Sequence, residues 1–128
     1  MEIRSMTEEE LALIDKRFPD LLHNTESVSL SAVIDDAWVG YMVAARMNNG
    51  SWHLQNIEVE PSHRRRRVAS ALFTEMFKRI GDAVYTLSVQ SDNQVGIRLF
   101  KREGFQFTPS GGRRGPRMMI REPAASAQ

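Results

Sequence analysis

The chain has 128 residues, of which 41% are hydrophobic and 26% charged, and its formal net charge is +1. This length suits one domain with a core of its own, and the near-neutral charge argues against a surface-wide attraction for nucleic acid. The chain contains no cysteine, which excludes disulfides, thiolate metal ligands and a covalent cysteine intermediate, and its three histidines lack the spacing of a zinc site, so we expect no metal.

The N-terminal half predicts a strand, a helix and a three-stranded meander. Residues 3–6 can form a short strand, and Thr7-Glu8-Glu9-Glu10 is a capping box that begins a helix. From residue 28 the hydrophobic period changes to two, which is typical of strands. Turn signals at Asp35-Asp36 and Asn48-Asn49-Gly50 then separate three predicted antiparallel strands, which cover residues 28–34, 38–46 and 52–59.

The C-terminal half predicts two helices and three strands. Apolar residues with helical spacing cover 69–80, and Gly81 is placed to end that helix. A strand follows at 84–89, then a helix capped by Asp92-Asn93 and ended by Gly104. The last strands are predicted at 105–107 and 117–120. The order β-α-β-β-β-α-β-α-β-β predicts an α+β (mixed α/β) domain.

The connection between the third meander strand and the next helix is strongly basic. The strand breaks at Pro61, four arginines follow as Arg64–Arg67, and a helix begins at once. A helix start presents unpaired N–H groups and a positive dipole end, and guanidinium groups suit phosphate oxygens. We therefore predict a pyrophosphate site. A solvated basic turn is the plainer interpretation, and a nucleic-acid patch is disfavoured because no aromatic residues interleave with the arginines.

Two motifs resemble those of the GNAT superfamily of acetyl-CoA-dependent N-acyltransferases, and the resemblance runs from about Ile3 to Ile120. The first is Val59-Glu60-Pro61 followed by Arg64–Ala69, where the family has Arg/Gln-x-x-Gly-x-Gly/Ala. The second is the strand ending at Asn93, followed by the aromatic residue and the Gly-Phe of Leu99–Phe105. The resemblance implies the acyl-CoA N-acyltransferase fold, with a central, twisted, mostly antiparallel sheet of about six to seven strands flanked by about four helices. Residues 1–122 would form this single domain and residues 123–128 a disordered tail.

The resemblance also implies acetyl-CoA as co-substrate. The loop from Arg64 to Ser70 would hold the pyrophosphate by its backbone amides, and the strand edge near Ile57 and Val59 would bond the pantetheine arm. The thioester would lie where this strand splays from strand 84–89. Asn93, which is also a helix cap, would bond a pantetheine amide. The implied cofactor-binding residues are Ile57, Val59, Arg64, Arg65, Arg66, Arg67, Val68, Ala69, Ser70, Asn93 and Phe100.

The chain departs from the family pattern at two positions. Arg67 stands where the family has the first glycine of its loop. An arginine still supplies its N–H, and its guanidinium could bind a phosphate directly. Phe100 stands where many members have the tyrosine that protonates the CoA thiolate, and a phenyl ring cannot donate a proton. The enzyme then uses water or another donor, or it does not turn over.

The candidate catalytic bases are His53, acting through water, and then Glu58. If the strand has no bulge, His53 shares a face with Gln55, Ile57 and Val59, and Glu58 points to the opposite face. His53 and Gln55 match positions where family members place a base, although an amide cannot serve. The alternative interpretation of His53 is an ordinary polar strand residue.

Three functional hypotheses follow. The first is an acetyl-CoA-dependent N-acetyltransferase that acts on a primary amine, of a small molecule or a protein, by direct attack in a ternary complex. The second is a catalytically weak or inactive acetyl-CoA-binding regulator, and the third a nucleic-acid-binding domain that uses Arg64–Arg67. The expected partners are acetyl-CoA and the amine, without nucleic acid, and a homodimer is left open. Because no apolar run approaches the ~20 residues that span a bilayer and no signal-peptide segment is seen, we expect no membrane partner and a cytoplasmic location.

Overall fold

The computed structural model describes residues 1–19, 26–64, 67–109 and 115–123. The elements follow the predicted order, and their bounds are β1 (Glu2–Ser5), α1 (Glu8–Arg17), β2 (Ser27–Ile34), β3 (Ala37–Arg46), β4 (Trp52–Val59), the 3₁₀ turn η1 (Pro61–His63), α2 (Val68–Ile80), β5 (Tyr85–Gln90), α3 (Gln94–Arg102), β6 (Gln106–Phe107) and β7 (Pro116–Arg121). The expected tail lies outside the described residues except for its first residue.

The number of helices is lower than the resemblance implied. Among the described residues there are three α-helices and one 3₁₀ turn, against the expected four helices or so. Helix α1 ends at its C-cap Phe18, whose φ of −133° and ψ of 74° are not helical. Pro19 follows, and a proline drives the residue before it out of the helical region. None of the described helices is long and apolar enough to cross a membrane.

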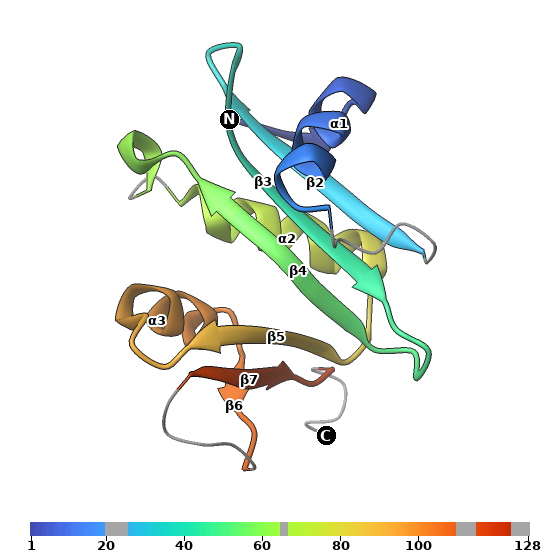
Figure 1. Ribbon diagram of the computed structural model, residues 1–128, viewed down its shortest axis with the longest axis vertical. Helices are drawn as coiled ribbons and strands as arrows, with labels where there is room; N and C mark the ends of the chain where they lie inside the picture. The colour runs from blue at the N-terminus through green and yellow to red at the C-terminus, as the bar shows by residue number, and fades with distance from the viewer. Residues whose placement is uncertain (20–25, 65–66, 110–114, 124–128) are drawn as a thin grey trace.

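The seven strands in the described part of the chain form one sheet in the order β1-β2-β3-β4-β5-β7-β6. Every neighbouring pair is antiparallel except β4 and β5, which run parallel. In Figure 1, α1 lies in front of β2 and β3, whereas α2 lies behind the sheet. The mostly antiparallel sheet and the predicted meander of β2, β3 and β4 are therefore confirmed.

The two hairpins of the meander have the turns that their residues favour. Asp35 and Asp36 both have left-handed backbones, with φ of 50° and 63°, which is the geometry of the tight turn that joins twisted strands. In the second hairpin Gly50 has φ of 88°, and the side chain of Asn49 accepts a hydrogen bond of 3.0 Å from the Ser51 N–H. Both turns lie where the sequence predicted them.

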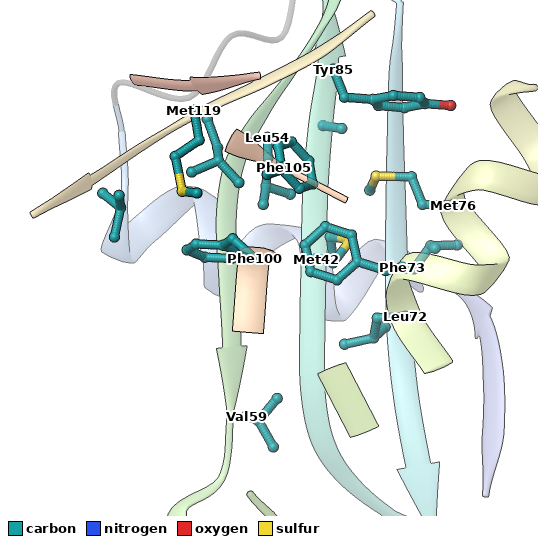
Figure 2. Packing of buried hydrophobic residues seen from close by; sticks show 14 of the residues in the cluster. Met42, Leu54, Val59, Leu72, Phe73, Met76, Tyr85, Phe100, Phe105 and Met119 are labelled. Atoms are coloured by element: carbon teal, nitrogen blue, oxygen red, sulfur yellow. The ribbon is translucent and has the colours of Figure 1, made fainter. Parts of the chain in front are cut away.

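The main core lies between the sheet and helices α2 and α3. Leu72, Phe73 and Met76 form the buried face of α2, and Figure 2 shows them against strand side chains such as Met42 and Leu54. A smaller cluster lies on the opposite face, where Ile14 of α1 packs with Met6, Tyr41 and Val43. The two faces of β3 are thus both covered, each by a different helix.

The predicted capping box fixes α1 against the first two strands. The Thr7 side chain accepts from the Glu10 N–H at 3.2 Å, and the Glu10 carboxylate accepts from the Thr7 N–H at 2.9 Å. The same carboxylate accepts two hydrogen bonds of 2.9 Å from Arg4 and one of 2.8 Å from the buried Ser31. The Arg4 guanidinium is the main reason that the pKa of Glu10 falls to about 2.

Candidate functional site

Strands β4 and β5 meet at one end and separate toward the other. They pair only at Trp52 with Tyr85 and at His53 with Thr86, although both strands are described in full. Figure 1 shows their C-terminal ends spreading apart. The splay that the resemblance implied is therefore present. Beyond the pair of His53 and Thr86, no residue of β4 pairs with β5, so the polar groups of β4 on this side are available to another molecule.

Helix α2 begins without a side-chain cap. Its N-cap is Arg67, with a left-handed backbone at φ 61° and ψ 24°, and the Arg67 side chain makes no capping hydrogen bond. The other two helices are capped, α1 by Thr7 and α3 by Asn93. The first N–H groups of a helix have no partner within it, and together with the dipole they favour an anion. An uncapped helix start is the local geometry that the predicted anion site requires, and the site itself stays a prediction.

The backbone of Arg67 explains the glycine that the family has at this position. A φ of 61° is unfavourable for a residue with a Cβ but costs glycine nothing. The arginine adopts the same turn with some strain, and its own N–H group remains at the helix start.

Several predicted phosphate-binding residues offer their backbone rather than their side chain. Arg64 turns back, so that its Nε donates to the Val59 carbonyl at 3.1 Å. Val68 is completely buried. The Ser70 hydroxyl donates to the Glu103 carboxylate at 2.9 Å, which ties the start of α2 to the end of α3. Arg65 and Arg66 lie outside the described residues.

Close packing brings the start of α2 against the meander. A Cβ on Gly40 of β3 would lie 3.0 Å from the Glu58 carbonyl oxygen and 3.3 Å from Val68 Cγ1. Gly40 pairs with Val59, the last residue of β4. The absence of a side chain at Gly40 therefore lets the first turn of α2 sit directly on the end of β4.

Asn93 and Phe100 lie at the two ends of α3. The Asn93 Oδ1 accepts from the Gly96 N–H at 3.0 Å, so the predicted helix cap is confirmed. Phe100 is 7% exposed, and its ring contacts those of Phe73 and Phe105 with centroid distances of 6.1 and 6.3 Å. Figure 2 shows Phe100 among the core side chains. Phe100 is thus a core residue, and its contact with a cofactor stays a prediction.

A β-bulge in β4 changes the faces on which the candidate bases lie. Val43 pairs with Asn56 and Ala44 with Leu54, so Gln55 has no partner on β3. Trp52, Leu54 and Val59 belong to the main core, and Ile57 packs against it. The prediction that His53 shares a face with Ile57 and Val59 is therefore wrong, because it assumed a strand without a bulge. The extra residue reverses the alternation and places His53 and Glu58 on the same face, the one that α1 partly covers.

His53 lies where the two strands begin to separate. Its Nδ1 is 2.8 Å from the Thr86 hydroxyl oxygen on β5. Burial lowers the pKa of His53 below its usual value. The imidazole is therefore neutral near pH 7, the state in which it can accept a proton.

Glu58 lies in a shallow pocket between α1, β3 and the end of β4. Its carboxylate accepts a hydrogen bond of 2.8 Å from the Tyr41 hydroxyl and lies 3.4 Å from Arg17 Nη2. Burial and then this hydrogen bond raise the pKa of Tyr41, which keeps the phenol protonated as a donor. The residues that line the pocket are Arg17, Trp38, Val39, Gly40, Tyr41, Glu58, Glu60 and Pro61.

Sequence reasoning missed the partners of both candidate bases. Thr86 and Tyr41 carry no motif, and each becomes relevant only through the register of a neighbouring strand. Thr86 pairs with His53, and Tyr41 with Glu58. The only sequence signal for either is that a polar residue falls on a strand next to the predicted site.

Comparisons with known proteins agree with this architecture. An uncharacterized protein of Mycobacterium leprae (strain TN) is 28% identical over 88 residues, which are 66% of this chain and 24% of that protein. The chain thus spans about a quarter of the length of that relative.

Solved structures share the fold at low identity. A ribosomal-protein-S18-alanine N-acetyltransferase from Escherichia coli is 18% identical with a TM-score of 0.77, over 94% of this chain and 92% of that chain. The PaiA N-acetyltransferase from Thermoplasma acidophilum, in complex with coenzyme A, is 16% identical with a TM-score of 0.77, over 94% and 98%. An aminoglycoside 6'-N-acetyltransferase from Enterococcus faecium is 15% identical with a TM-score of 0.72, over 94% and 96%. The family model described as "Acetyltransferase (GNAT) family" matches residues 2–105, most of the chain. The protein belongs to the GNAT family of acetyltransferases.

Proposed function

We propose that the protein is an acetyl-CoA-dependent N-acetyltransferase that acts on a primary amine by direct attack in a ternary complex. One observation carries the proposal: the uncapped start of α2 follows the end of β4, where that strand has separated from β5. An anion site beside an unpaired strand edge suits a molecule with a pyrophosphate and a long arm of amides. A related fold was solved with coenzyme A bound, which supports this choice of cofactor.

The cofactor would follow the path that these groups define. Backbone N–H groups at Val68, Ala69 and Ser70 would bind the pyrophosphate, with Arg67 beside them. The pantetheine amides would pair with the edge of β4 near Ile57 and Val59. Asn93 would bond a pantetheine amide through its Nδ2, because its Oδ1 already caps α3. This Nδ2 has no partner among the described residues. The acetyl group would then lie toward the point where β4 and β5 meet.

The reaction needs one proton acceptor and one proton donor. The amine arrives as R–NH3⁺ and loses a proton through His53, or through Glu58 as the second candidate, to solvent. Its nitrogen then bonds to the acetyl carbon, the carbon–sulfur bond breaks, and a second N–H proton ends on the CoA sulfur. Because the chain has no cysteine, the acetyl group does not pass through an acyl-cysteine. Most of the rate gain would come from positioning and from polarisation of the carbonyl by a backbone N–H of β4.

With Glu58 as the base, the second candidate, the pocket around it supports an amine as the acceptor. A carboxylate beside the rings of Trp38 and Tyr41, whose centroids are 5.9 Å apart, is a suitable environment for an ammonium group. Arg17 contacts Glu58 only at 3.4 Å and its side chain is 57% exposed, so this ion pair is weak and can give way to a substrate cation.

An acetyl-CoA-binding regulator without turnover is the second candidate. The observation that favours it is Phe100, whose ring fills the core where many family members have a proton-donating tyrosine. Such a protein would bind the cofactor by the same groups and would differ only in the chemical step.

Ligand-dependent unfolding separates these candidates. At a concentration 100-fold above Kd, acetyl-CoA should stabilise the protein by about 2.7 kcal/mol, which for a chain of this size is a Tm increase of roughly 10 °C. Release of CoA thiol is then measured against a panel of small amines and peptides. No Tm shift would refute both candidates. A shift without thiol release on any amine would favour the regulator.

A further inference from the structure

His53 belongs to a row of residues that crosses the sheet at the point where β4 and β5 separate. Ala45 of β3 pairs with His53, His53 with Thr86 of β5, and Thr86 with Ile120 of β7. Directly paired residues share a face, so these four side chains lie side by side. The pair of His53 and Thr86 is the last one that joins the two strands.

Within this row Thr86 is the only polar neighbour of the imidazole. Ala45 and Ile120 are apolar. The charged side chains described on these strands lie outside this row. The adjacent row, which includes Arg46, Tyr85 and Arg121, is on the opposite face. Arg121 confirms this, since its guanidinium lies 3.7 Å from the ring centre of Phe77 on α2.

The charged groups on the same face are further away along β4. His53 pairs with Ala45 and Glu58 with Tyr41, four residues apart on β3, so Glu58 lies roughly 13 Å away at ~3.3 Å per residue, and it is bonded to Tyr41 and Arg17. Burial lowers the pKa of His53. The Thr86 hydroxyl is therefore the one described group that bonds this imidazole.

We propose that Thr86 is a positioning residue for His53: its hydroxyl holds Nδ1, so that Nε2 is the nitrogen presented to the acceptor amine. The contact of 2.8 Å between Nδ1 and Oγ1 carries the inference, and Nε2 has no partner among the described residues. The catalytic role of His53 rests on the proposed function, whereas the orientation of its ring by Thr86 does not.

A threonine suits this role in two ways. For Nε2 to accept a proton, the neutral ring must carry its own proton on Nδ1, so the Thr86 hydroxyl accepts from Nδ1–H both in the neutral ring and in the imidazolium. Its β-branch restricts χ1 in a strand, which fixes the hydroxyl. The ring can therefore keep one orientation while Nε2 accepts the proton of the ammonium and passes it to solvent. A carboxylate at the same place would raise the pKa of His53 and retain that proton.

The test compares Thr86→Val, which removes the hydroxyl and nearly keeps the shape, with Thr86→Ser, which keeps the hydroxyl. Thr74→Val, on the exposed side of α2, is the matched control. We expect T86V to lower kcat about 10-fold with an unchanged KM for acetyl-CoA, since a misoriented base loses part of the 10²–10⁴-fold that such groups supply. T86S should stay within about threefold of the wild type, and T74V should equal it. Equal kcat values for T86V and the wild type would overturn the proposal.

A second measurement does not depend on turnover. The ¹⁵N resonances of the His53 ring, assigned with His53→Ala, are followed against pH in all variants. T86V should move the Nδ1 resonance, T86S should restore it, and Thr86→Asp should raise the pH at which the ring titrates. Unchanged His53 signals in T86V would overturn the proposal. If the wild type acetylates no amine while T86V still moves the Nδ1 signal, the proposed function fails and the positioning stands.

Discussion

The left-handed backbone of Arg67 allows a prediction that separates the backbone of the anion site from its charge. Arg67→Gly should stabilise the ligand-free protein. A left-handed conformation costs a residue with a Cβ about 1–2 kcal/mol, whereas glycine adopts it freely. The glycine variant in turn loses about 0.5–1 kcal/mol of stability, because glycine gives the unfolded chain more conformational freedom. The net gain is about 0.5–1 kcal/mol, or roughly 2–4 °C in Tm.

Arg67→Ala is the matched control, because it removes the guanidinium but keeps the unfavourable φ of 61°. Thermal unfolding without ligand measures the strain, and calorimetric titration with acetyl-CoA measures the affinity. We expect R67G to be more stable than R67A, and to bind acetyl-CoA at least as tightly as R67A does. The affinity lost in R67A relative to the wild type reports what the guanidinium contributes at the phosphates.

Two results would contradict this reasoning. If R67G is no more stable than R67A, the left-handed turn carries no strain. If R67G binds acetyl-CoA much more weakly than R67A, the arginine backbone supports the anion site in a way that glycine cannot, and the family's glycine needs another explanation.

Three further changes test other parts of the structure. In Gly96→Ala the new Cβ would lie 2.5 Å from the amide nitrogen of the Asn93 side chain that caps α3, so this cap must move, and its loss should cancel the gain of about 1 kcal/mol that alanine ordinarily brings to a helix; thermal unfolding should show no rise in Tm, and a rise of roughly 3–4 °C would contradict the clash. Ser70→Ala should lose about 1 kcal/mol through its bond to Glu103 while calorimetry finds the acetyl-CoA affinity unchanged, because the phosphates would use the backbone N–H. The pKa of Glu10 is lowered from 4.5 to about 2, so its stabilisation is complete above pH 4.5 and is lost as the pH falls toward 2. Urea unfolding of Glu10→Gln should therefore show a smaller fall in stability over that interval, and a pH dependence equal to the wild type would refute this assignment.

Local signals in the sequence account for most of the fold. The capping box at Thr7, the turn at Asp35-Asp36 and the terminator Gly81 each act over a few residues, and all three lie where they were predicted. The two motifs that carry the resemblance also placed the splay between β4 and β5, because they mark the ends of these strands.

Features that depend on pairing between strands were not predictable in the same way. The bulge at Gln55 depends on the alignment of β3 and β4, and no property of glutamine predicts it. That one residue moved His53 to the face of Glu58. The contact of His53 with Thr86 likewise requires the parallel register of β4 and β5, which residues far apart in the sequence determine together. The fold was therefore easier to predict than the arrangement of the candidate site.

The separation of β4 from β5 also places an open strand edge in the middle of the sheet instead of at its margin. Such edges attract extended segments of other chains, and natural proteins protect them with nearby charges. Beyond the pair of His53 and Thr86, the backbone groups of β4 that face β5 need water or another molecule as a partner. We expect the ligand-free protein to aggregate more readily than the liganded one, and light scattering at equal protein concentration measures this difference.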